Sequence, residues 1–80
     1  MMSFEACKKV VQNTFPRQNL VEAYEYDENH FMFTVIKKRN EPQFDDPYCA
    51  IDRRTGKVSH ILPTIDLEKF DDVINNHKIY

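Results

Sequence analysis

The stretch from Asp46 to Pro63 constrains the fold of this chain more than any other, because it has the pattern of a strand, a tight turn and a returning strand. The turn contains Gly56, the only glycine in the sequence, at the point where a positive φ angle is most often needed. Pro47 and Pro63 bracket the stretch, and a proline nitrogen cannot donate to a sheet ladder. The pattern therefore predicts a β-hairpin over residues 48–62.

Two other segments have helical periodicity. Near the start, apolar side chains recur three and four residues apart, in a helix that begins after the N-cap Ser3 and ends near Thr14, ahead of Pro16. Near the end, a second apolar stripe over residues 67–77 follows Asp66, which is a good N-cap. The pattern predicts two core-facing helices, with residues 77–80 left as a tail.

The pattern of residues 20–38 predicts a second β-hairpin. Residues 20–26 are rich in strand formers, although their apolar and polar side chains alternate imperfectly. Residues 27–29 have turn chemistry, and residues 31–36 of the following strand are apolar on both faces. A strand that is central in a sheet, or covered on both faces, has this pattern, so we expect residues 31–36 to be the most buried part of the hairpin.

This order of elements predicts a single α+β domain over residues 1–80. Short connections within each hairpin favour a four-stranded antiparallel sheet, and the simplest packing places both helices on one face of it. The other face would then carry several large side chains that are unusual on a solvated surface and typical of interfaces. These residues are Tyr24, Tyr26, Met32, Tyr48 and His60.

Composition and charge exclude several classes of function. With 41% apolar and 30% charged residues, the chain is globular rather than disordered. A net charge of −2 predicts no general affinity for nucleic acid or for an anionic membrane, and the basic clusters at residues 37–39 and 53–57 lie at opposite ends of the predicted sheet. Charged residues interrupt the first fifteen positions and no membrane span is visible, so we expect no secretory signal and a cytoplasmic protein.

The residues that most often carry chemistry do not form a recognisable site. The three histidines, Cys7 and Cys49 lack the paired spacing of a zinc site, and the two cysteines are expected to be buried thiols. Cys49 and His60 lie on paired strands, but strand counting does not place them opposite each other, and no glycine-rich turn is available to bind an oxyanion. We therefore expect no metal, no cofactor and no catalysis.

The helix Glu5-Ala-Cys-Lys-Lys-Val-Val11 and the hairpin Tyr48-Cys-Ala-Ile-Asp-Arg-Arg-Thr-Gly-Lys-Val58 together resemble a PepSY-type module, over roughly residues 3–62. In size and hairpin sequence, the chain is also similar to small bacterial immunity proteins of toxin systems. Either resemblance implies an inhibitory or binding role without catalysis. Neither resemblance assigns a functional role to any residue of this chain, because neither pattern contains a functional residue here.

We therefore predict a small protein-binding module of the inhibitor, immunity or phage- or plasmid-encoded modulator type. Its contacts would come from the aromatic sheet face and from the loop at residues 39–47, where Phe44 is either a partner anchor or a lid folded back on the core. The tyrosines have a second interpretation, in which they stack across strands and contact no partner. The expected contact residues are Tyr24, Tyr26, Phe44 and Tyr48, surrounded by Asp45, Asp46, Arg53 and Arg54.

The second hypothesis is a structural or assembly subunit that uses the same aromatic face to form a homodimer. In that case the partner is a second copy of the chain rather than another protein. Small domains with a limited core often gain stability by pairing in this way.

Overall fold

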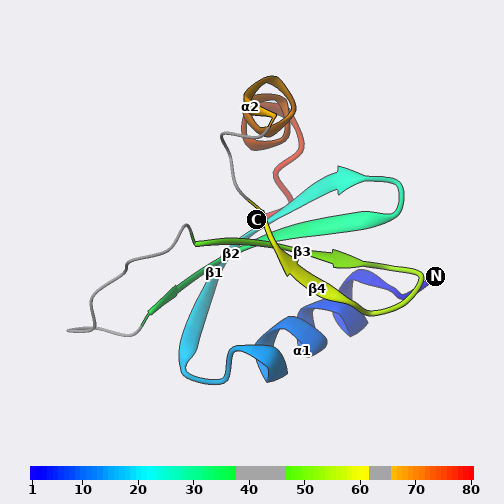
Figure 1. The fold of residues 1–80 in the computed structure, drawn as a ribbon, viewed down its shortest axis with the longest axis vertical. Coiled ribbons are helices and arrows are strands. Elements are labelled where there is room, and N and C mark those ends of the chain that lie inside the picture. Colours follow the sequence, from blue (N-terminus) through cyan, green and yellow to red (C-terminus); the bar gives the residue numbers. More distant parts are fainter. Residues whose placement is uncertain (38–46, 62–65) are drawn as a thin grey trace.

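The computed structural model describes residues 1–37, 47–61 and 66–80. In chain order, its elements are α1 (Phe4–Thr14), β1 (Gln18–Asp27), β2 (His30–Lys37), β3 (Tyr48–Asp52), β4 (Val58–His60) and α2 (Leu67–Asn76). The strands form one sheet in the order β1-β2-β3-β4, each antiparallel to its neighbour (Figure 1). The predicted α+β order of helix, two hairpins and helix is confirmed.

Both helices begin at the residues that the sequence predicts. The Ser3 side chain accepts a hydrogen bond from the backbone N–H of Ala6 at 3.2 Å, and the Asp66 carboxylate accepts one from that of Lys69 at 3.2 Å. Each cap satisfies a backbone donor that would otherwise have no partner within the first helical turn. The first helix ends at Thr14, as Pro16 requires.

The prediction that both helices lie on one face of the sheet is wrong. Helix α1 packs against the face that carries Phe33, and α2 packs against the opposite face, which carries Met32 (Figure 1). Both side chains are fully buried, although they are neighbours in β2 and point to opposite faces. An amphipathic helix covers only one face of a sheet, so a strand that is apolar on both faces requires a helix on each side.

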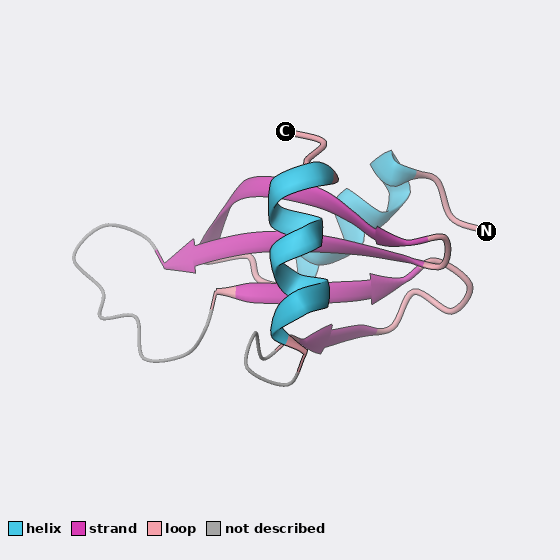
Figure 2. Cartoon of the chain, turned by 90° about the horizontal axis from the view of Figure 1, so that it is seen from above, coloured by secondary structure: helices cyan, strands magenta, loops and turns pink. Residues whose placement is uncertain are grey.

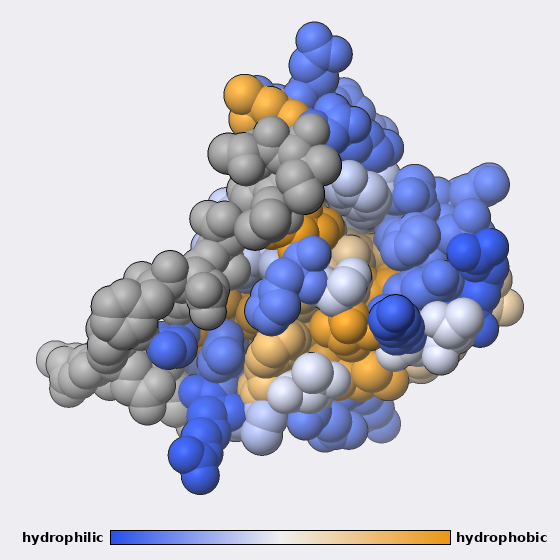
Figure 3. Space-filling view, viewed as in Figure 1, coloured by the Kyte–Doolittle hydropathy of each residue, from blue (hydrophilic) through white to orange (hydrophobic). Residues whose placement is uncertain are grey.

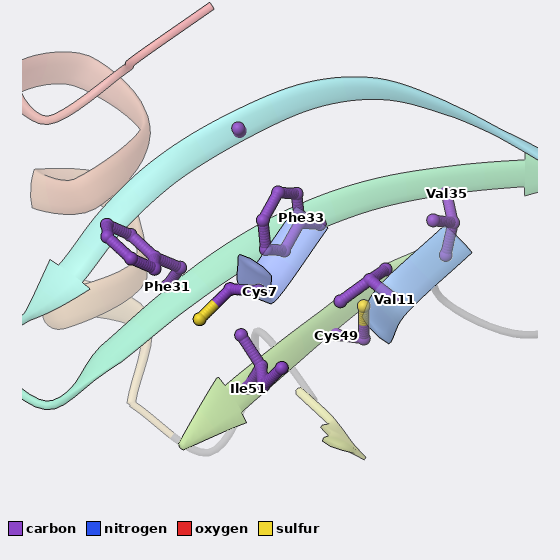
Figure 4. Close-up of a cluster of buried hydrophobic side chains, with 8 residues drawn as sticks. Cys7, Val11, Phe31, Phe33, Val35, Cys49 and Ile51 are labelled. Carbon is purple, nitrogen blue, oxygen red and sulfur yellow. The ribbon is translucent and has the colours of Figure 1, made fainter. Parts of the chain in front are cut away.

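Among the described residues, more buried side chains belong to the core under α1 than to the core under α2. Cys7 and Val11 point from the helix towards the sheet, where side chains from β2 and β3 surround them (Figure 4). Cys7 and Cys49 are both free and fully buried, which confirms the expected pair of buried thiols. The sheet side of this layer consists of Ala23, Phe31, Phe33, Val35, Cys49 and Ile51.

A bulge explains the imperfect alternation of β1. The pairing with β2 shifts between Leu20 and Glu22, so Val21 has no partner on β2 and its side chain is 41% exposed. Beyond the bulge the faces are exchanged, so Leu20 and Ala23 both contribute to the core under α1.

The segment after α2, predicted as a tail, pairs with the outer edge of β1. The backbone N–H of Ala23 donates to the carbonyl of Tyr80 at 2.8 Å, and that of Glu25 donates to the carbonyl of His77 at 2.9 Å. The N–H of Ile79 returns a bond to the carbonyl of Ala23 at 2.7 Å. Residues 77–80 therefore act as a short added strand on this edge.

The glycine in the β3–β4 turn has the expected conformation. Gly56 has a φ angle of +76°, and its N–H donates to the carbonyl of Asp52 at 2.7 Å. A Cβ atom at this position would lie 3.4 Å from the sulfur of Met2. The turn therefore needs glycine because of its backbone conformation more than because of limited space.

We predict that Gly56→Ala lowers the free energy of unfolding by about 1 kcal/mol, because a left-handed conformation is strained for a residue with a Cβ atom. Urea denaturation followed by circular dichroism measures this loss. Gly56→Asn is the matched control, since asparagine tolerates the left-handed region better and should lose less stability. Equal stability of the wild type and the alanine variant would contradict the prediction.

Candidate functional site

Helix α2 covers the sheet face that was expected to present tyrosines to a partner. Tyr24 is only 2% exposed, and its hydroxyl donates a hydrogen bond of 2.8 Å to Oε2 of Glu22. Burial, together with this bond to a carboxylate, raises the pKa of Tyr24 to about 12. In this structure Tyr24 is therefore a core residue that donates a hydrogen bond, and its side chain is not available at the surface.

The other two tyrosines lie half-buried against α2. The Tyr48 ring meets the Phe70 ring edge-on at a centroid distance of 4.8 Å, and Lys69 places its ammonium group 5.1 Å from the centroid of the Tyr26 ring. Burial is also the main cause of the raised pKa of Tyr26. These contacts belong to packing between the helix and the sheet, so they leave little of either ring for a partner.

A carboxylate links this packed face to the C-terminal segment. Oε2 of Glu22 lies 3.1 Å from Nζ of Lys78, in addition to accepting the Tyr24 hydroxyl. The hydrogen bond from Tyr24 is the largest cause that lowers the pKa of Glu22, and the contact with Lys78 is the next largest. A carboxylate with a lowered pKa stabilises the fold above about pH 4, and this contribution is lost as the pH falls through the lowered pKa.

Arg53 is a structural residue that joins three segments. Its Nε donates to the carbonyl of Met2 at 3.1 Å, and one terminal nitrogen donates to the carbonyl of Glu28 at 3.3 Å. Its guanidinium carbon also lies 4.6 Å from the centroid of the Phe31 ring. Arg54 is different, because its side chain is 59% exposed and pairs only locally, with Asp52 at 3.2 Å. Of the two expected arginine contacts, Arg54 alone remains largely on the surface.

The remaining expected contacts, Phe44, Asp45 and Asp46, lie outside the described residues, as does most of the loop at residues 39–47. Their role as partner contacts stays a prediction.

The expectation that Cys49 and His60 are not opposite each other is wrong, because the register of β3 and β4 pairs them directly. The N–H of Asp52 donates to the carbonyl of Lys57, so the turn spans residues 53–56 as expected, and counting back along the strands from that pair places Cys49 opposite His60. Burial raises the pKa of Cys49 to about 11, so its thiol remains protonated at neutral pH. A protonated, fully buried thiol is a poor nucleophile.

A second histidine lies between two carboxylates. Nδ1 of His30 is 2.9 Å from Asp27 at the end of β1, and Nε2 is 3.9 Å from Asp52 at the end of β3. Burial alone would raise the pKa of Asp27, but the hydrogen bonds from His30 and from the backbone N–H of Asn29 lower it. Among the described residues, no group of three or more histidine, cysteine, aspartate and glutamate side chains is arranged to hold a metal ion.

The side of β4 that faces away from β3, here called the β4 edge, presents backbone hydrogen-bonding groups that point away from the sheet. Asp52 donates its N–H to the carbonyl of Lys57, and Ile61 donates its N–H to the carbonyl of Tyr48. Because hydrogen-bonded and non-hydrogen-bonded pairs alternate in an antiparallel ladder, Ser59 also bonds inward. The backbone groups of Val58 and His60 therefore point outward, and the described part of the chain places no strand against them.

Apolar side chains flank the β4 edge on both faces of the sheet. Val58 and Phe15 are half-buried on the α1 side, where the Phe15 and His60 ring centroids are 6.0 Å apart. On the α2 side lie Ile61, which is half-buried, and Leu67, which is 58% exposed at the start of the helix. Figure 3 shows apolar surface in the middle of this side of the molecule, between the helix at the top and the helix at the bottom.

Helix α2 crosses the strands, and it begins near the β4 edge and ends at β1. Its C-terminal end is held at β1, since His77 accepts the bond from Glu25, whereas Phe70 near its start packs on Tyr48 in β3. Figure 2 shows the helix lying across the sheet from the β4 side to the β1 side. The first turn of α2, with Leu67, therefore lies towards the β4 edge.

No protein-family model, curated protein or solved structure matches this chain. The resemblance to PepSY-type modules and to small immunity proteins therefore stays a prediction. None of the helices in the described ranges is long and apolar enough to cross a membrane.

We predict that Arg53→Met lowers the free energy of unfolding by about 2 kcal/mol, because it removes charge-assisted hydrogen bonds to two carbonyl groups. The matched control is Arg54→Met, which removes only an exposed ion pair and should have a much smaller effect. Both losses are measured by urea denaturation. An Arg54 loss equal to the Arg53 loss would contradict the structural role of Arg53.

Proposed function

We propose that this protein is a small non-catalytic protein-binding module whose β4 edge accepts an extended segment of a partner protein as an added strand. The observation that carries the proposal is the pair of outward-pointing backbone units at Val58 and His60. Strand addition uses such groups for affinity, and side-chain pockets beside them for specificity.

The chemistry of the edge supports this kind of partner. Natural proteins often protect an exposed edge with charged side chains or proline, and residues Val58–His60 contain neither. The half-buried residues Val58 and Ile61 point to opposite faces, so an added strand with alternating apolar side chains can cover both. The edge thus fits an uncharged, extended peptide segment better than it fits a nucleic acid or a small polar ligand.

The rest of the molecule supports binding rather than catalysis. The Cys49 thiol is protonated and buried, and the tyrosine hydroxyl of Tyr24 is committed to Glu22. The proposal places the module in the cytoplasm, where Cys7 and Cys49 stay reduced.

We predict that His60→Pro abolishes binding of peptides selected against the wild-type chain from a random library of segments of about six residues, a typical strand length. Proline at position 60 removes an outward N–H and blocks the edge, while the inward bonds of Ser59 and Ile61 remain. Fluorescence polarisation with labelled peptides measures the affinity.

The control variant is His60→Ala, which keeps the backbone N–H and removes only the imidazole ring. It should bind the selected peptides within a few-fold of the wild type, and circular dichroism should show that both variants fold. Selected peptides that bind His60→Pro as tightly as the wild type would contradict strand addition at the β4 edge.

A further inference from the structure

We infer that the strand accepted at the β4 edge is β4 of a second copy of this chain, in an antiparallel pair with a two-fold axis through Ser59. The inference rests on the proposed strand-accepting function and names its partner. It differs from a dimer formed through the aromatic sheet face, because α2 covers Tyr24 and much of that face.

The backbone of β4 is complementary to itself. The outward-pointing residues Val58 and His60 lie one on each side of Ser59. A two-fold axis through Ser59 therefore sets Val58 opposite His60 of the second copy, and His60 opposite its Val58. In an antiparallel ladder, each of these two pairs exchanges two N–H···O bonds. Four backbone bonds would then join two four-stranded sheets into one eight-stranded sheet.

The position of α2 adds an apolar contact across the same axis. One row of residues on this face runs through Tyr24, Met32, Ala50 and Ser59, which are successive partners across the four strands. Val73 of α2 packs with the first two of these side chains, so the helix lies over the row, and its start lies on the β4 side of the sheet (Figure 2). The two-fold axis would bring the two α2 starts, each with an exposed Leu67, to face each other above the joined strands.

The charges near the axis do not prevent this pairing. Within β4 itself, the pairs across the axis contain no lysine, arginine, aspartate or glutamate. The net charge of −2 per chain is small. Asp66 and Glu68 at the α2 starts would approach their counterparts, so added salt should strengthen the dimer by screening this repulsion.

The opposite sheet edge favours a closed dimer over an open-ended polymer. Residues 77–80 occupy the edge of β1 at Ala23 and Glu25, and the bulge at Val21 interrupts the strand beyond them. Pairing of β4 with β1 of the next copy would repeat without closing, whereas β4 pairing with β4 closes at two copies. Because residues 77–80 already occupy the edge of β1 at Ala23 and Glu25, β4 of a second copy cannot pair with β1 there, which favours the β4–β4 contact.

Sedimentation equilibrium across micromolar to millimolar concentrations tests this inference directly. The wild type should pass from the monomer mass to twice that mass, at lower concentration when the salt is raised. His60→Pro should stay monomeric because it blocks the edge, and Leu67→Glu should stay monomeric because it places charge at the α2 contact. Glutamate is well tolerated in a first helical turn, so Leu67→Glu should keep the fold.

The matched control is Val21→Glu, which charges a similarly exposed apolar residue at the far edge of the sheet and should dimerise like the wild type. A wild type that stays monomeric throughout would overturn the second-copy inference, and peptide selection would then still decide the proposed function. A dimer that persists in both His60→Pro and Leu67→Glu would also overturn the inference, and it would show that copies meet elsewhere.

Discussion

The whole structure depends on the double-sided burial of β2. Met32 and Phe33 are both fully buried, although adjacent residues of a strand point to opposite faces. Burying a large apolar side chain contributes on the order of 2 kcal/mol, so neither face can be left to solvent in a chain of this size. One helix is needed on each face, and the two core layers follow from that requirement.

The position of α2 determines how the two sheet edges differ. The helix crosses the strands and ends over β1, where residues 77–80 turn down and pair with that edge. Tyr80 then reaches the other side of the sheet, where its ring lies 5.9 Å from the Phe4 ring. The C-terminal segment thereby ties both layers together at β1. The opposite edge, at β4, receives no such segment from the described residues, and the start of α2 brings Leu67 towards it.

Much of the fold could be predicted from local patterns. Ser3 and Asp66 begin helices because each side chain caps a backbone N–H, and Gly56 adopts the positive φ angle that its turn needs. The hairpins and the buried thiols follow from alternation and from burial of apolar residues. Interactions of this kind link residues close in sequence, so a single sequence is enough to predict them.

The predictions that failed concern contacts between distant segments. The apolar pattern of residues 31–36 indicated that both sheet faces need cover, but the prediction placed both helices on one face. The observed position of α2 on the face opposite α1 converts Tyr24 from an expected contact into a core residue. The bulge at Val21 changes which side chains of β1 share a face. The pairing of Cys49 with His60 could have been predicted, because a turn over residues 53–56 already leads to it when the strands are counted correctly. The sequence shows that Val58–His60 carries no charged side chain, but only the strand order shows that this segment lies at an edge of the sheet.

Amide hydrogen exchange along β4, measured by NMR at a concentration where the chain is monomeric, tests the account most directly. If the β4 edge is open, the amide of Ser59 exchanges slowly because it bonds inward to β3, while those of Val58 and His60 exchange fast. Slow exchange at all three amides of the monomer would contradict the account, because it would show that the outward groups of β4 already have partners within the chain.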